Sequence, residues 1–269
     1  QTSCSSDLRG KDNSARFLSR VHEYILCYSK NIEILDFLRI ELSEQTLDQY
    51  QNPDNDPRGV YRKLALWRRG GQGGSREYAF TTKEGLTVTS RAWLVNESTM
   101  QELDKDDKLV VIGDNLYRKL FLNEHNGAIP ETIWLDTSNT ANATDELKDL
   151  FNISPFDTPK PTPLIKRILQ ISTAPNDIVL DFFAGSGTTA QAVMELNFEE
   201  TQKAEKDGLL AEGKAGGRKF ILVQLPEKIS EKAEAFKAGY RVISDITMER
   251  VRRAGGKYKG VDVDFQIFK

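Results

Sequence analysis

An apolar run that ends in an acid and passes through two glycines into a helical pattern constrains this chain most. Residues 179–189 have the sequence VLDFFAGSGTT. Gly185 and Gly187 permit positive φ and let a ligand approach the backbone closely. The exposed amides of a first helical turn attract an anionic group, and Asp181 at the strand's carboxyl end can take a cation. The pattern predicts a ligand pocket or, more simply, a tight strand-to-helix turn capped by Thr188.

The flanking segments extend this turn into a strand, helix, strand unit. Apolar strands are predicted over 178–183 and 219–225, with a helical pattern over 188–196 and a Glu/Lys/Gly-rich insertion over 199–217 between them. Such a βαβ unit belongs to α/β folds. A dinucleotide fingerprint would place a third glycine where Ala190 stands, and alanine is tolerated there. A nicotinamide-dependent oxidoreductase therefore stays open on the turn alone.

The chain changes character near residue 150. Before it, residues 32–150 hold short apolar runs broken by Pro/Asn/Asp and glycine clusters, and residues 21–28 form a predicted buried strand. After it, a proline-punctuated segment over 154–163 leads into an amphipathic run. We therefore predict a core strand in 1–31, a mixed, loop-rich region in 32–150, and an α/β unit in 151–269 with a charged helix over 231–253.

Basic and aromatic residues gather in one window of the middle region. The net charge of −3 argues against coating nucleic acid by bulk electrostatics, but a local basic face can still bind phosphates. The alternative is a solvated, glycine-rich surface loop. Trp93 and Trp134 are expected to pack the core of this region. The candidate DNA contacts are Arg58, Arg62, Lys63, Trp67, Arg68, Arg69 and Arg76.

Composition excludes several classes of function. No apolar run approaches the roughly 20 residues that span a bilayer, so no membrane segment is expected. Two cysteines, Cys4 and Cys27, suit a reducing compartment and predict a cytoplasmic protein. His22 and His125 lack metal-ligand spacing, so no metal site is predicted. The chain begins with Gln rather than Met, and we expect a fragment.

Three segments together resemble a known family. Residues 181–189 (DFFAGSGTT) resemble motif I of the amino-methyltransferases that act on DNA bases, with type III modification subunits as the nearest group. Residues 156–164 (FDTPKPTPL) resemble motif X, and residues 218–227 (RKFILVQLPE) resemble motif II. The order X, I, II is typical of the β group. Segments 22–31, 52–59 and 238–250 are also typical of type III modification subunits, so the resemblance covers nearly the whole chain.

The resemblance implies an α/β fold: a Rossmann-like S-adenosylmethionine (SAM)-dependent methyltransferase domain with a partial, mixed sheet and an inserted, mixed α+β target-recognition domain. Motif II commonly carries an acid for the ribose hydroxyls where Gln224 stands here, and Glu227 is the substitute. The residues that the resemblance assigns to the cofactor are Asp181, Phe183, Gly185, Gly187, Thr188, Thr158, Lys160, Gln224 and Glu227.

The chain departs from the family in one motif. The catalytic Asp/Asn/Ser-Pro-Pro-Tyr/Phe motif is absent, since none of the nine prolines is followed by another. We therefore expect a carboxy-terminal portion without catalytic residues and inactive alone. The resemblance implies adenine-N6 methylation of double-stranded DNA, a homodimeric subunit and an ATP-dependent restriction subunit as partner. The alternative is a non-catalytic module that binds DNA or a partner.

Overall fold

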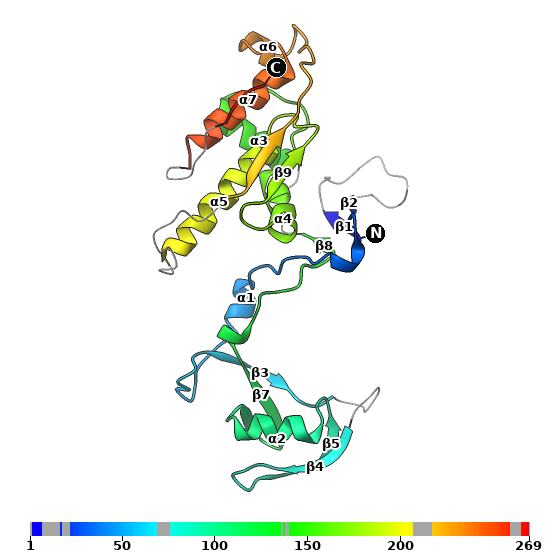
Figure 1. Ribbon diagram of the computed structural model, residues 1–269, viewed down its shortest axis with the longest axis vertical. Helices are drawn as coiled ribbons and strands as arrows, with labels where there is room; N and C mark the ends of the chain where they lie inside the picture. The colour runs from blue at the N-terminus through cyan, green and yellow to red at the C-terminus, as the bar shows by residue number, and fades with distance from the viewer. Residues whose placement is uncertain are drawn as a thin grey trace. The chain divides into compact units, whose positions relative to one another are not determined.

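The computed structural model divides the chain into two compact units (Figure 1). Unit 1 comprises Gln1–Ile40 and Ile129–Lys269, and unit 2 comprises Glu41–Ala128. The structure describes residues 2–6, 17, 22–68, 76–135, 137, 140–206, 217–258 and 265–268. The unit that interrupts the chain is shorter at both ends than the insertion predicted over 32–150.

A parallel strand pair forms the centre of one half of unit 1. Strand β9 (Ile178–Asp181) leads through the glycine turn into helix α5 (Thr188–Lys206), and β10 (Lys219–Leu222) returns beside β9. The register aligns Lys219 with Ile178 and Leu222 with Asp181. The predicted strand, helix, strand unit is confirmed. Helix α5 is longer than predicted because part of the expected insertion continues it.

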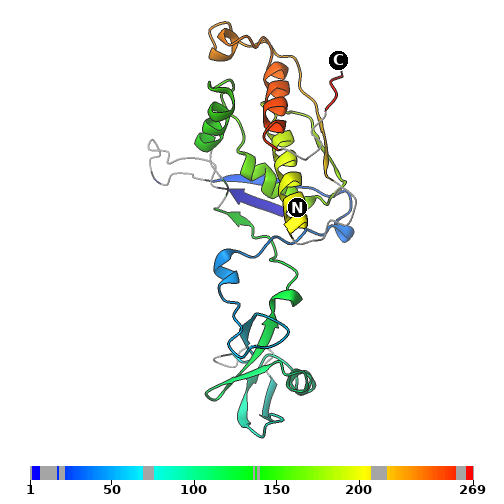
Figure 2. The ribbon, with the colours of Figure 1, turned by 90° about the vertical axis from the view of Figure 1, so that its left-hand side faces the viewer.

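Four more described helices belong to this half of unit 1. Helix α4 (Thr162–Ser172) packs its Leu169 against Val193 and Leu196 of α5, and α7 (Ile243–Gly255) packs Val251 and Ala254 against the same helix. Both α5 and α7 lie on one side of the strand pair (Figure 2). Helix α3 (Thr140–Phe151) also contributes to the core. The single helix predicted over 231–253 is wrong: α6 (Glu234–Lys237) and α7 are separate.

A second, mixed sheet lies in the other part of unit 1. Strand β1 (Thr2–Ser6) pairs antiparallel with β2 (Glu23–Cys27) and parallel with β8 (Ile133–Trp134), and a short 3-10 helix, η1 (Ile32–Ile34), follows β2. The strand predicted over 21–28 is confirmed as β2, but its predicted burial is wrong, because Tyr24 and Leu26 are 58% and 54% exposed. Trp134 packs against Leu164 and Ile171 of α4, so it belongs to unit 1 and not to the middle region.

Unit 2 is a small α+β unit with its own core. Its three-stranded antiparallel sheet has the order β3-β7-β6, and a β4–β5 hairpin and helix α2 enclose Trp93, Met100 and Leu116, which are fully buried. The mixed α+β composition predicted for the middle region is confirmed. The elements are α1 (Glu44–Leu47), β3 (Tyr61–Ala65), β4 (Arg76–Thr81), β5 (Thr87–Trp93), α2 (Glu97–Lys105), β6 (Leu109–Ile112), β7 (Asn115–Phe121) and the 3-10 helix η2 (Leu122–Glu124).

One face of the β9–β10 pair is apolar and exposed. Alternate residues Val179, Phe220 and Leu222 pack toward α5 and its neighbours. Their neighbours along the strands point the other way; Ile178, Leu180, Ile221 and Val223 are 63%, 47%, 51% and 44% exposed. Parallel sheets are normally covered on both faces. Among the described helices, none has the length and apolar character of a membrane span.

Candidate cofactor site and nucleic-acid interface

The turn between β9 and α5 requires its two glycines. Gly185 and Gly187 have φ of +52° and +85°, where side chains are strained. A Cβ on Gly187 would lie 3.2 Å from the carbonyl oxygen of Thr247, and one on Gly185 would lie 3.4 Å from the ring of Phe156. The sequence therefore produces a turn that packs against α7 and the motif X segment on the sides where Cβ atoms would point, so glycine is required at both positions.

Asp181 ties the two sides of this turn together. Its Oδ1 accepts a hydrogen bond from the backbone N of Phe183 at 3.0 Å, and its Oδ2 accepts from Thr189 Oγ1 at 2.6 Å. A carboxylate has about four acceptor positions, so capacity for a cationic ligand group remains. The backbone amides in the first turn of α5 have no partner within the helix, and the helix dipole favours an anion there. The arrangement suits a zwitterionic amino-acid group.

The two predicted ribose-side residues have different surroundings. Gln224 Oε1 accepts from the backbone N of Gly185 at 2.7 Å, and its Nε2 donates to the carbonyl oxygen of Leu225 at 3.1 Å. This amide is occupied in fixing the glycine turn. Glu227 is exposed beyond the end of β10. Gln224 is therefore already hydrogen-bonded within the protein, whereas the exposed carboxylate of Glu227 is accessible to a sugar hydroxyl.

The motif X segment lies against the motif I turn. Thr188 Oγ1 donates to the carbonyl oxygen of Lys160 at 3.2 Å, so the two segments predicted to enclose the cofactor are in contact. The Lys160 ammonium lies 3.4 Å from Glu23 Oε2 on β2. Thr158 and Lys160 are exposed, and the ring of Phe183 is 88% exposed at the turn. All nine predicted cofactor residues belong to unit 1.

Comparison with known proteins assigns the chain to a family. The profile of N6/N4 DNA methylases matches residues 7–235, which is most of the chain. The chain belongs to the DNA methylase family. Among curated DNA methylases it is 36% identical to the StyLTI Mod subunit of a type III restriction-modification enzyme from Salmonella typhimurium, over 88% of this chain and 35% of that protein. It is 33% identical to the EcoPI Mod subunit of Escherichia phage P1, over 91% of this chain and 41% of that protein.

A type II relative and a solved structure complete the comparison. The type II methyltransferase M.KpnI of Klebsiella pneumoniae is 30% identical over 93% of this chain and 62% of its own length. The solved cytosine-N4-specific PvuII DNA methyltransferase is similar over 72% of this chain and 58% of its own, with 15% identity and a TM-score of 0.23. The predicted resemblance to type III modification subunits is confirmed. This methylase chain spans less than half the length of the two modification subunits it matches.

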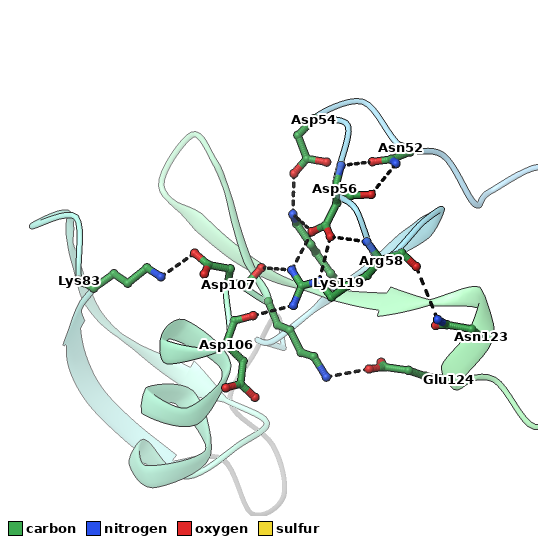
Figure 3. A network of polar contacts seen from close by, with 11 residues as sticks. Asn52, Asp54, Asp56, Arg58, Lys83, Asp106, Asp107, Lys119, Asn123 and Glu124 are labelled. Atoms are coloured by element: carbon green, nitrogen blue, oxygen red, sulfur yellow. Dashed lines mark hydrogen bonds and ion pairs between the residues drawn. The ribbon is translucent and has the colours of Figure 1, made fainter.

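Arg58, predicted as a DNA contact of the methylase, has a structural role in unit 2 (Figure 3). Its guanidinium donates to both carboxylate oxygens of Asp56 and to the carbonyl oxygens of Asp106 and Asp107, through four of its five N–H groups. Lys119 binds the same Asp56 at 2.8 Å. These bonds from Arg58 and Lys119 hold the pKa of Asp56 well below its usual range. We therefore remove Arg58 from the candidate interface.

The other six predicted DNA contacts of the methylase differ in their surroundings. Lys63, Arg68 and Arg76 are exposed, and Arg62 is half-buried with its guanidinium 5.7 Å from the centre of the Tyr50 ring. Arg62 and Lys63 line a hollow of about 350 Å³ with Gln49, Gln51, Pro53 and Tyr61. Trp67 packs against the core of unit 2, which is a structural role rather than a stacking one. Arg69 lies outside the described residues.

Sequence reasoning missed the two residues of α7 that support the methylase turn. Thr247 Oγ1 donates to the carbonyl oxygen of Gly185 at 2.6 Å. Arg250, one helical turn later, has no exposed surface and donates to Ser186 and Thr188. Both lie in the segment 238–250, which resembled the family without a role being assigned. Their spacing of three residues on one helix face was the available signal.

Proposed function

We propose that this chain is the cofactor-binding and DNA-recognition part of a SAM-dependent modification methylase that methylates adenine at N6. The observation that carries the proposal is the glycine turn at Gly185 and Gly187, whose backbone lies where any Cβ would be strained or in contact. Family membership supports DNA as the substrate. The type III Mod subunits among the relatives support a restriction subunit as partner. Adenine N6, a homodimer and action in the cytoplasm are what the resemblance to type III modification subunits implies.

The residues of the turn fit the cofactor. The first-turn amides of α5 would hold the methionine carboxylate, Asp181 the ammonium group, and Glu227 the ribose. When bound, SAM supplies an activated methyl group on its sulfonium. The exocyclic amine of adenine is a poor nucleophile, so the base must be flipped out and oriented before transfer. This chain lacks the Pro-Pro motif that would orient the amine.

Methyl transfer therefore requires polypeptide beyond residues 1–269. The exposed apolar face of the β9–β10 pair supports this, because exposed apolar patches mark surfaces that bind other polypeptide. We propose that the remainder of a longer modification subunit covers this face. Incubation of this chain with labelled SAM and duplex DNA should transfer no methyl group. Transfer by this chain alone would contradict the division of labour.

SAM binding to the full chain, measured by isothermal titration, tests the cofactor site. Gly187→Asp should weaken binding by about a hundredfold or more, since a side chain is strained at φ +85° and its Cβ would press on Thr247 of α7, which displaces the turn. Gly85→Asp is the matched control: Gly85 has nearly the same φ, +87°, with nothing within 4 Å of an added Cβ, and lies in unit 2. It should bind like the parent. No binding by the parent would contradict a cofactor site formed by this chain.

The second candidate, a DNA-binding module without chemistry, is favoured by the absent catalytic motif and by the exposed cations of unit 2. Anisotropy of labelled duplex DNA, with and without SAM, distinguishes the candidates. Lys63→Ala should reduce the slope of log affinity against log salt by about 0.9 if this lysine binds one phosphate. Lys148→Ala, an exposed lysine on α3 of unit 1, serves as control. DNA binding that SAM leaves unchanged favours the module.

A further inference from the structure

We infer that Arg250 is a positioning residue that clamps the glycine turn to the motif X segment and places a positive charge, only partly balanced by its ion pair with Glu146, beneath the turn, where it favours a ligand carboxylate. This inference rests on the proposed SAM site. It assigns to the buried end of α7 a role that the motifs of the sequence do not indicate.

The contacts of Arg250 connect four chain segments. Its Nη1 donates to Ser186 Oγ at 2.9 Å and to Thr188 Oγ1 at 2.8 Å, so one nitrogen binds the side chains on both sides of Gly187. Its Nε donates to Gln191 Oε1 at 2.8 Å, one turn into α5. Its Nη2 donates to Thr162 Oγ1 at 3.1 Å, at the start of α4. The fixed fork of a guanidinium can satisfy these directions together, whereas a lysine ammonium cannot.

Two threonines transmit this clamp to the motif X segment. Thr188 Oγ1 accepts from Arg250 and donates to the carbonyl oxygen of Lys160. Thr162 Oγ1 accepts from Arg250 and donates to Glu146 Oε2 at 2.7 Å. The backbone between Lys160 and Thr162 is therefore held at both ends to groups that Arg250 fixes. A change at Arg250 alters the separation of the two segments that would enclose the cofactor.

The partners of Arg250 leave its charge incompletely compensated. All four hydrogen-bond acceptors are neutral hydroxyl or amide oxygens. The Glu146 carboxylate forms an ion pair with Nη2 at 3.7 Å but no hydrogen bond, and its Oε2 already accepts from the Thr162 backbone and hydroxyl. Burial lowers the pKa of Arg250 to about 10, and the Glu146 charge opposes this shift. The side chain stays cationic at neutral pH.

This charge reinforces the helix dipole. The amino terminus of α5 carries a partial positive charge that attracts anions. A buried cation that hydrogen-bonds the turn from below adds to the same potential, and low local polarity screens it little. Even a paired buried charge is costly to a fold, and a neutral residue of similar shape often serves stability as well. A ligand that carries negative charge above the turn would complete the compensation of Arg250.

Arg218 provides a matched control within the same unit. Its side chain is also buried, at 2% exposure, and its guanidinium donates to Thr173 Oγ1, the Thr173 carbonyl oxygen and Glu200 Oε2. None of these partners belongs to the glycine turn. Arg218→Met should therefore lower stability without changing the preference of the turn for a carboxylate.

The experiment compares SAM with decarboxylated SAM, which lacks only the carboxylate, by titration against the full chain and its folded variants. The parent should prefer SAM. Arg250→Met and Arg250→Gln should reduce the ratio of the two affinities by about tenfold, equivalent to about 1.4 kcal/mol. Arg250→Lys should keep the ratio, because it keeps the charge, while both affinities fall. Arg218→Met should keep the ratio.

Three outcomes overturn the inference and differ from failure of the proposed function. A parent that binds both ligands equally shows that no charge is felt at the turn. Neutral Arg250 variants that keep the parent ratio show the same. Neutral variants that fail to fold while Arg250→Lys binds like the parent make Arg250 structural only. A parent that binds neither ligand contradicts the proposed SAM site itself, and the inference fails with it.

Discussion

Both units contain buried basic side chains, but nearby carboxylates balance the charges of these side chains to different extents. In unit 2, Lys119 binds Asp54 at 2.5 Å and Asp56 at 2.8 Å, and Arg58 binds the same Asp56 (Figure 3). Two cations face two carboxylates there. In unit 1, Arg218 is paired with Glu200 at 2.6 Å, whereas Arg250 hydrogen-bonds neutral groups and its ion-pair partner Glu146 lies 3.7 Å away. A closely paired network stabilises a fold, whereas a loosely paired cation leaves positive potential for a ligand.

The two units also differ in how completely they bury their apolar residues. Unit 2 closes its core, and Trp93, Met100 and Leu116 have no exposed surface. Unit 1 covers one face of the β9–β10 pair and exposes the apolar residues of the other. Unit 2 therefore has the properties of a self-sufficient fold. Unit 1 has an exposed apolar face, which we propose that additional polypeptide covers.

The largest expected effect is on the core of unit 2. Trp93→Ala should destabilise this unit by about 3–5 kcal/mol, because it removes a fully buried ring and leaves a cavity. Hydrogen exchange should accelerate throughout 41–128 and stay unchanged in α4 and α5. Leu94→Ala, at a residue 41% exposed, is the control. Exchange that accelerates equally in both units would show that they fold as one.

The second largest effect is expected on the charge network of Lys119, Asp54, Asp56 and Arg58 in unit 2. Lys119→Met removes the cation between Asp54 and Asp56 and should lower the free energy of unfolding of unit 2 by about 2–3 kcal/mol. This is less than for a fully buried pair because Asp54 is 46% exposed and Arg58 remains. Lys63→Met, directly opposite on β3 and exposed, should change stability little. SAM binding should be unaffected by either. A Lys119 variant as stable as the parent would make the network incidental.

A smaller effect is expected from acid, which should reduce the stability contributed by the Asp54 and Asp56 carboxylates of unit 2 but not the contribution of Arg250 in unit 1. Lys119 lowers the pKa of Asp54, and Arg58 and Lys119 lower that of Asp56, so both carboxylates contribute stability above the pKa of the unfolded chain. That contribution should be lost as pH falls below about 4 and through the lower folded-state pKa. Arg250 stays protonated throughout this range in both states and adds no pH dependence. Asp56→Asn should flatten the acid-dependent rise in hydrogen exchange in unit 2; an unchanged profile would contradict this assignment.

Local patterns in the sequence predicted the order of elements better than their ends. The strand predicted to residue 183 ends at Asp181, because this carboxylate accepts from the backbone N of Phe183 and starts the turn. Helix α5 continues to Lys206 through Glu and Lys residues that favour helix. The helix predicted over 231–253 is interrupted at Gly239, whose φ is +102°. Each difference arises from one residue's hydrogen bond or conformation.

Contacts between distant residues could not be predicted from one sequence. The turn residues were found because they lie together in the chain. Gln224 meets Gly185 across 39 residues, and Arg250 meets Ser186 across 64. Arg58 was chosen for its charge and its basic neighbours, but Asp106 and Asp107 engage it from 48 and 49 residues away. Burial and pairing of charges decide such roles, and both are properties of the folded chain.

The smallest expected effect tests the exposed face of unit 1. Ile221 and Leu222 are neighbours on β10 with opposite orientations: Ile221 is 51% exposed, and Leu222 packs beside α5 and α7. In this chain Leu222→Thr should cost about 2 kcal/mol, because it buries a hydroxyl and loses apolar contact. Ile221→Thr should change stability by less than about 0.5 kcal/mol. Urea unfolding of both variants measures the difference.

The same pair of variants shows whether further polypeptide covers this face. In a longer modification subunit that includes the covering segment, Ile221→Thr should cost about as much as Leu222→Thr, because both faces of a covered parallel sheet are buried. If Ile221→Thr already costs as much as Leu222→Thr in this chain, residues of the chain itself cover the face, and unit 1 is as self-sufficient as unit 2. If it costs little in both proteins, the covering segment lies elsewhere and the catalytic part must reach the glycine turn by another route.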